Sequence, residues 1–109
     1  MISMSISSSS QKHPEKDLAL ARKIVLRGLR KYSARVFLFG SRATGRAAHA
    51  SDIDIAVLPE NSLPEGVLAE LREQLEESSI IYTVDLVNLE SAEEGLRERV
   101  LKEGIEWNV

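Results

Sequence analysis

Apolar residues recur along the chain at two spacings, and the alternation between these spacings predicts the order of helices and strands. Three stripes at three- and four-residue spacing predict amphipathic helices, two of them beginning near Pro14 and Pro64 because proline suits the first turn of a helix. Ser91 and Glu94 form a capping box that predicts the start of the third helix, and Gly104 is placed as its stop. The stripes are Leu18, Ala21, Val25, Leu29 and Tyr32, then Val67, Leu68, Leu71 and Leu75, then Leu96, Val100 and Leu101.

Short runs of β-branched and aromatic residues predict three strands, and a short edge strand is expected near the end of the chain. The runs span residues 35–39, 52–58, 80–89 and 105–109. A short helix is predicted after Ser41, between the first two strands. The order is therefore α-β-(α)-β-α-β-α, with the short helix in brackets. It predicts an α/β (α+β) fold in which helices cover a small mixed sheet.

The composition is that of one globular domain, since 109 residues with 43% hydrophobic side chains can form a modest core. We assign this domain to residues 14–109 and expect the Ser-rich tail, residues 1–13, to be disordered. The absence of cysteine excludes a disulfide framework and a thiolate zinc site. No apolar stretch approaches the roughly 20 residues of a membrane span, and the start lacks the features of a signal peptide. We therefore expect a cytoplasmic protein without a membrane partner.

The charges are unevenly distributed, although the net charge is only −3. Residues 1–46 hold ten Lys or Arg and two acids, whereas residues 47–109 hold four Lys or Arg and fifteen acids. Such segregation is typical of a basic surface for a phosphate-bearing ligand or an acidic partner, and equally of a basic helix that rests near acidic helices. No aromatic-rich basic groove indicates binding of nucleic acid.

Two carboxylates interrupt the second predicted strand. Asp52 and Asp54 are two residues apart and share one face of the strand, while Ile53 and Ile55 fill the other. Neighbouring carboxylates repel each other, and burial strengthens the repulsion. A divalent cation between them would relieve it, and hard oxygen ligands of this kind suit Mg²⁺. We interpret the pair as metal ligands, because an exposed acidic strand face does not explain two acids among Ile, Val and Leu.

The first predicted strand stops abruptly at Gly40-Ser41, which is followed by Arg42 and Arg46. Glycine lets the backbone approach a ligand closely and adopt a positive φ. Backbone N–H groups and a hydroxyl at such a turn can bind an anion, and the two arginines suit bidentate contacts with phosphate. We interpret this turn as a phosphate-binding site beside the carboxylate pair; the alternatives are a plain tight turn and surface arginines.

The motif from Phe39 to Arg46, followed by Ser51-Asp52-Ile53-Asp54, has ten residues between Gly-Ser and Asp-x-Asp. It resembles the signature of the minimal nucleotidyltransferases (MNT), a small branch of the DNA polymerase β superfamily, and the resemblance covers roughly residues 18–107. It implies the nucleotidyltransferase fold and a third carboxylate on the neighbouring strand, a role that Asp85 matches. From the pattern of apolar and polar residues alone, the simpler interpretation is that Asp85 lies on the exposed face of a strand.

The resemblance also implies an activity. Two Mg²⁺ ions would be held by Asp52, Asp54 and Asp85, with Asp85 on the side of the attacking hydroxyl, while Gly40, Ser41, Arg42 and Arg46 would bind the phosphates of ATP. MNT proteins resemble antitoxins paired with HEPN-type toxins, so the expected reaction is transfer of AMP to a tyrosine hydroxyl of a toxin in a homo- or hetero-oligomeric assembly. The alternative is an antitoxin of the same fold that acts by contact alone. A nucleotidyltransferase of the antibiotic-modifying type is less favoured, because the expected acceptor domain is missing.

Overall fold

The structure is a computed structural model that describes residues 14–40, 43 and 52–107. The Ser-rich tail and, apart from the helical Ala43, the short helix predicted after Ser41 lie outside the described residues. The elements are α2 (Pro14–Gly28), β2 (Ala34–Phe39), β3 (Ile53–Pro59), α4 (Val67–Glu77), β4 (Val84–Asn88), α5 (Glu94–Glu103) and β5 (Ile105–Trp107). None of the helices in this described part is both long and apolar enough to cross a membrane.

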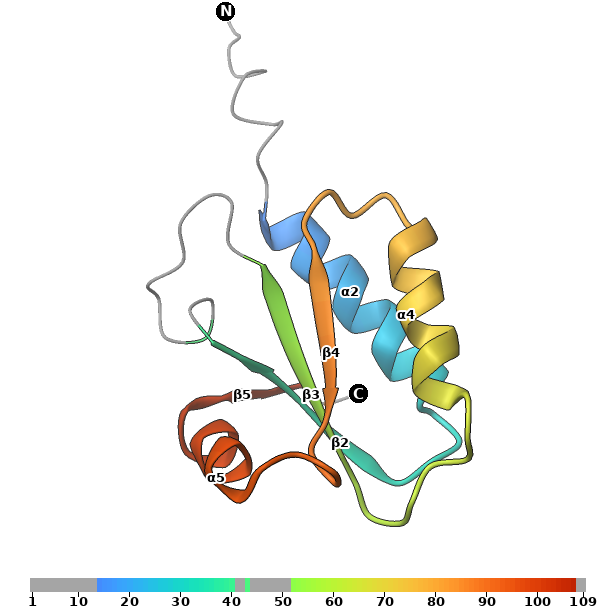
Figure 1. The fold of residues 1–109 in the computed structure, drawn as a ribbon. Helices are drawn as coiled ribbons and strands as arrows, with labels where there is room; N and C mark the ends of the chain where they lie inside the picture. The colour runs from blue at the N-terminus through green and yellow to red at the C-terminus, as the bar shows by residue number, and fades with distance from the viewer. Residues whose placement is uncertain (1–13, 41–42, 44–51, 108–109) are drawn as a thin grey trace, which may run out of the picture.

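The strands form one mixed sheet of four strands in the order β4-β3-β2-β5. β2 runs antiparallel to both of its neighbours, whereas β3 and β4 are parallel. Figure 1 shows α2 and α4 side by side on one face of this sheet and α5 on the other. The predicted fold class is therefore confirmed, as is the predicted edge strand, which pairs with β2 from Ile105 to Trp107.

Two apolar clusters hold the layers together. The larger one joins the stripes of α2 and α4 to the side chains on one face of the sheet, among them the fully buried Ile53, Ile55 and Val57. The smaller one lies under α5 and contains Phe37, Ala56, Leu89 and Val100. β3 is thus buried on both faces along most of its length, which explains its nearly continuous apolar sequence.

The third strand is shorter than predicted. The run 80–89 suggested a strand throughout, but β4 begins only at Val84. Val84 pairs with Ile53, the first residue of β3, so the strand pairing with β3 begins only there. Residues 80–83 instead form an irregular segment between α4 and β4, which we call the 80–83 segment.

Two helix starts and one inward residue were also predicted wrongly. α4 begins at Val67 rather than at Pro64, because Gly66 adopts a left-handed φ of 91° as its N-cap. α5 begins at Glu94 after Glu93, without a side-chain cap, and the hydroxyl of Ser91 donates to the carbonyl of Asn88 instead of forming a capping box.

Leu101 is 43% exposed, since it follows the buried Val100 by one position and turns away from the sheet. Gly104 is confirmed as the helix end, where its N–H donates to the carbonyl of Val100.

Leu71 and Leu101 offer a matched test of the core. Leu71 is 2% exposed and packs against Gly28, whereas Leu101 lies at the surface. We expect Leu71→Ala to lower the free energy of unfolding by about 3 kcal/mol because it removes buried apolar contacts and leaves a cavity. Leu101→Ala should change it by less than about 0.5 kcal/mol. Urea unfolding followed by circular dichroism measures both, and equal losses would contradict the assigned core.

An ion pair links the edge strand β5 to β2. The guanidinium of Arg35 donates to both carboxylate oxygens of Glu106 at 3.0 Å, and it lies 5.0 Å from the centre of the Phe37 ring. These hydrogen bonds lower the pKa of Glu106 below its ordinary value of 4.5. The Arg35 side chain is 56% exposed, so solvent screens the attraction and its effect on stability is small.

The lowered pKa of Glu106 gives this ion pair a defined pH dependence. Its contribution is present above pH 4.5, the ordinary pKa, and is lost as pH falls through the lowered value in the folded state. We therefore expect Glu106→Gln to melt slightly below the wild type at neutral pH, and the difference to vanish in acid. Thermal unfolding at a series of pH values measures this, and a difference that grows in acid would refute it.

Candidate functional site

The carboxylates singled out in the sequence lie on two adjacent parallel strands. Asp54 of β3 and Asp85 of β4 are register partners, so their side chains leave the same face of the sheet. Asp52 directly precedes β3 and is exposed, Asp54 is half-buried and Asp85 is exposed. The predicted alternation is confirmed, since Ile53 and Ile55 are fully buried on the opposite face. The structure therefore brings Asp54 and Asp85 together, a pairing that residues 31 positions apart in the sequence did not reveal by themselves.

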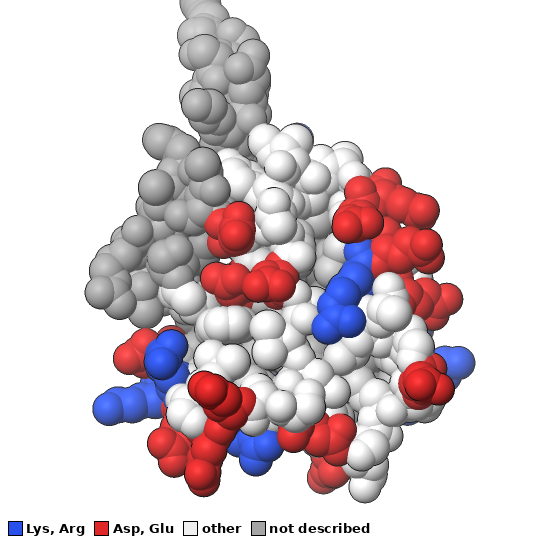
Figure 2. All heavy atoms as spheres, in the orientation of Figure 1, with Lys and Arg blue, Asp and Glu red and all other residues white. Residues whose placement is uncertain are grey.

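These carboxylates lie on the sheet face that α5 covers, just beyond the part of that face that α5 contacts. Phe37 and Ala56, which lie under α5, share their face of the sheet with Asp54 and Asp85. Asp54 comes two residues before Ala56 and so lies on the same face, toward the start of β3. Figure 2 shows acidic side chains gathered over the starts of β3 and β4. Among the described residues, α5 therefore covers one end of this sheet face but not the end that carries Asp54 and Asp85.

Gly40 ends β2 beside Asp54. Phe39 pairs with Asp54 across the two strands, and Gly40 follows it with a φ of 79°, the left-handed conformation that favours glycine. Its carbonyl accepts a hydrogen bond of 3.1 Å from the N–H of Ala43, which closes a turn. A Cβ at this position would lie only 2.5 Å from Oδ2 of Asp54. Glycine is therefore required both by the backbone conformation and by the close approach of the carboxylate.

Ser41, Arg42 and Arg46, which the sequence assigned to phosphate binding, lie outside the described residues, and their roles stay predictions. Within residues 14–40, 43 and 52–107, no three His, Asp or Glu side chains gather closely enough to hold a metal ion. The donors fit Mg²⁺ in chemistry, because it commonly takes one or two carboxylates and completes its coordination with water and substrate phosphates. Asp54, with Asp85 directly opposite on the adjacent strand, supplies such oxygen donors.

Two arginines that the sequence analysis missed brace β4, the strand that carries Asp85. From α4, Arg72 donates a hydrogen bond of 2.8 Å to the carbonyl of Leu86, the residue after Asp85. From α5, Arg97 donates to the carbonyl of Leu89 at 2.9 and 3.2 Å. Because β4 is at the edge of the described sheet, these bonds satisfy carbonyls near or on an edge strand. The sequence did contain a signal for Arg72, because it is the one basic residue within the acidic helix α4.

The structure places a glycine turn at the end of β2 and aspartates on β3 and β4 of a mixed sheet, and the comparison with known families gives the class of protein. The sequence matches the family described as polymerase beta, nucleotidyltransferase over residues 27–106, which is more than half of the chain. The chain belongs to this family and is an enzyme of the nucleotidyltransferase class. The resemblance drawn from the motif is thereby confirmed.

Two curated relatives are named protein adenylyltransferases. The chain is 33% identical over 86 residues to the probable protein adenylyltransferase MntA of Haemophilus influenzae, covering 79% of this chain and 74% of the relative. It is 41% identical over 69 residues to the protein adenylyltransferase MntA of Shewanella oneidensis, covering 63% of this chain and 49% of the relative. The chain thus matches about half the length of the second relative.

Solved structures agree in fold. A protein described as a minimal nucleotidyltransferase is similar with a TM-score of 0.65 and 34% identity, over 83% of this chain and 92% of that one. A toxin-antitoxin structure with AMP-PNP gives a TM-score of 0.63 and 33% identity, over 81% and 73%. A complex of a tri-AMPylated HEPN toxin with its MNT antitoxin, from Shewanella oneidensis, gives 0.57 and 31%, over 84% and 72%.

Proposed function

We propose that this chain transfers AMP from ATP to a hydroxyl side chain, a tyrosine by preference, of a HEPN-type toxin in the cytoplasm, and thereby acts as the antitoxin. The observation that carries the proposal is the register pairing of Asp54 with Asp85 next to the Gly40 turn. It places a carboxylate from each of two strands on one sheet face, at the end that α5 does not cover. We take residues 14–109 as the domain that performs this reaction.

The residues fall into two groups in the proposed reaction, and Asp85 has a second role. Asp52 and Asp54, together with Asp85, would hold Mg²⁺, which supplies Lewis-acid stabilisation of phosphate charge when bound. Gly40, Ser41, Arg42 and Arg46 bind and orient the phosphates of ATP. Asp85 stands on the side of the attacking hydroxyl and accepts its proton. The hydroxyl oxygen then bonds to the α-phosphorus, and pyrophosphate leaves.

The relatives support the acceptor and the nucleotide in this proposal. Both curated relatives carry the name protein adenylyltransferase. Among the solved neighbours, one toxin-antitoxin structure holds AMP-PNP, and in another the HEPN toxin is itself AMPylated. These are properties of those proteins, and their similarity over most of this chain is the reason to expect the same reaction here.

The proposal is tested by labelling. The purified chain is incubated with labelled ATP, Mg²⁺ and a purified HEPN-type toxin. We expect label on the toxin, and an added AMP on a hydroxyl side chain by mass spectrometry. Without the toxin, turnover should be slow, because a two-substrate transfer is fast only when both reactants are held in line.

Asp85→Asn separates catalysis from contact. The variant should bind the toxin but fail to label it, because the carboxylate on the nucleophile side is lost. If wild type and Asp85→Asn neutralise the toxin equally well, and no modification is found, the protein acts as a contact antitoxin of the same fold and the transferase proposal is wrong.

A further inference from the structure

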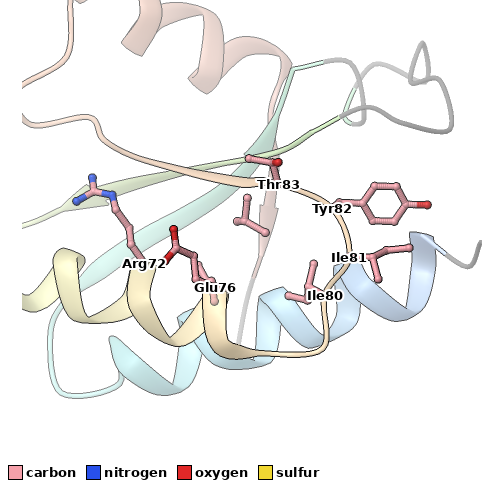
Figure 3. Close-up of a pocket in the computed structure, with 8 residues that line it drawn as sticks. Arg72, Glu76, Ile80, Ile81, Tyr82 and Thr83 are labelled. Carbon is pink, nitrogen blue, oxygen red and sulfur yellow. The ribbon is translucent and has the colours of Figure 1, made fainter.

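One side chain of α4 reaches the strand that carries Asp85. Figure 3 shows Arg72 extending from α4 toward β4, with Glu76 beside it on the same side of the helix. The Nη2 atom of Arg72 donates a hydrogen bond of 2.8 Å to the carbonyl oxygen of Leu86, the residue that directly follows Asp85. The guanidinium therefore contacts the backbone of β4 within one residue of a carboxylate of the candidate site.

The carbonyl of Leu86 faces the outer edge of the sheet. In a parallel pair of strands, every second residue of a strand directs its N–H and carbonyl groups toward the partner strand. The carbonyl of Thr83 accepts a hydrogen bond of 2.9 Å from the N–H of Ile53, at the start of β3. By this alternation the backbone of Asp85 faces β3, whereas that of Leu86 faces away from it. β3 thus supports this part of β4 from one side, and Arg72 supports it from the other.

Asp85 lies near the end of a short edge strand. β4 has five residues and is at the edge of the described sheet, and Asp85 is its second residue. The 80–83 segment that precedes it is irregular. The end of a short edge strand opens locally at a lower free energy than the centre of a sheet. A displacement of the backbone here would move the side chain of Asp85 relative to Asp54, its register partner on β3.

α4 gives Arg72 a fixed base. Leu71, the residue before it, is 2% exposed and packs against Gly28 of α2, and Leu75 is buried one turn further along the helix. Arg72 itself is exposed on the helix, yet its hydrogen bond to Leu86 is partly buried. Hydrogen bonds from a charged donor are shorter and stronger than those between neutral groups. The bond therefore ties the edge strand to a helix that the core holds in place.

We propose that Arg72 is a positioning residue: by holding the carbonyl of Leu86, it keeps the carboxylate of Asp85 in place opposite Asp54. The inference rests on the proposed function, since it adds a residue that supports the same site. Arg72 acts through the backbone of β4 and not through contact with ATP. The Gly40 turn, which is proposed to bind the phosphates, ends β2 on the far side of β3. Loss of Arg72 should therefore lower kcat and leave the KM for ATP unchanged.

Arg97 provides a matched control. It also donates to backbone carbonyls, at 2.9 and 3.2 Å to Leu89 and at 3.3 Å to Glu90. These two residues follow the end of β4, and Leu89 lies four residues beyond Asp85, which is about 13 Å along an extended chain. Methionine keeps an unbranched apolar side chain but has no hydrogen-bond donor. The test therefore compares Arg72→Met with Arg97→Met in the full chain.

Transfer kinetics with labelled ATP, Mg²⁺ and a purified HEPN-type toxin give the first readout. We expect Arg72→Met to lower kcat by roughly tenfold, less than the hundredfold that a displacement of about 1 Å can cost. Arg72→Lys should restore part of the rate, because an ammonium group still donates to a carbonyl. Arg97→Met should keep the kcat of the wild type, although its melting temperature should fall at least as far as that of Arg72→Met because more hydrogen bonds are lost.

Amide hydrogen exchange gives a second readout that needs no turnover. In the chain without ligands, NMR should show faster exchange at residues 84–87 in Arg72→Met than in the wild type, because the outer edge of the strand is released. Arg97→Met should leave the exchange of these amides unchanged. If the wild type itself transfers no label, the proposed reaction is wrong, while faster exchange at residues 84–87 still supports Arg72 as the residue that holds Asp85 in place.

Three results would overturn the positioning proposal. The first is a folded Arg72→Met variant that transfers AMP with the kcat of an active wild type. The second is an equal loss of kcat in Arg72→Met and Arg97→Met, which would mean that both arginines act only through stability. The third is unchanged amide exchange at residues 84–87 in Arg72→Met.

Discussion

Asp54→Asn will abolish transfer of AMP while leaving the fold intact. Asp54 is half-buried at the start of β3, with Asp85 opposite it in register and the Gly40 turn against its Oδ2. Asparagine keeps the shape of the side chain but removes the negative charge that would hold Mg²⁺, the ion that would balance the charge of the phosphates. We expect the rate with saturating toxin and ATP to fall by roughly a thousandfold or more, which is about 4 kcal/mol of transition-state stabilisation.

Stability should move in the opposite direction from activity. Removing one of two neighbouring like charges relieves repulsion, so the melting temperature of Asp54→Asn without metal should equal or exceed that of the wild type. Glu60→Gln serves as the control and should retain full activity. It makes the same carboxylate-to-carboxamide change at an exposed residue just beyond the other end of β3. Substantial transfer by the Asp52→Asn, Asp54→Asn double variant would rule out the proposed site.

Gly40→Ala will lower both the affinity for ATP with Mg²⁺ and the transfer rate. Position 40 has a φ of 79°, where an L side chain is strained by about 1–2 kcal/mol. In addition, the new Cβ would meet Oδ2 of Asp54 at 2.5 Å, so the carboxylate or the turn must shift. A displacement of about 1 Å at a reacting centre can cost roughly a hundredfold in rate, and we expect a loss of this order.

Gly66→Ala is the matched control because it separates strain from obstruction. Gly66 also has a positive φ, 91°, but a Cβ there meets nothing within 4 Å. Gly66→Ala should lose stability through strain alone and Gly40→Ala by at least as much, whereas only Gly40→Ala should lose affinity for ATP in calorimetry. If both variants bind ATP as tightly as the wild type, the Gly40 turn is a structural turn without contact to the nucleotide.

The sequence by itself determined those features that repeat at short range. The spacing of Ala21, Val25 and Leu29 predicted the buried side of the first helix, and the two-residue spacing of Asp52 and Asp54 predicted their shared face. Both were right because a side chain's direction follows from the local geometry of a helix or strand. The motif around Gly40 likewise identified the family, since it is contiguous in the chain.

Only the tertiary structure decided which distant residues meet. The pairing of Asp54 with Asp85, and the start of β4 at Val84, depend on the register between two strands that are separated by a helix. The exposure of Leu101 and Ile81 and the engagement of Arg72 with Leu86 depend on which surfaces pack together. No local periodicity encodes these contacts, because they result from burying apolar area and satisfying backbone groups across the whole fold.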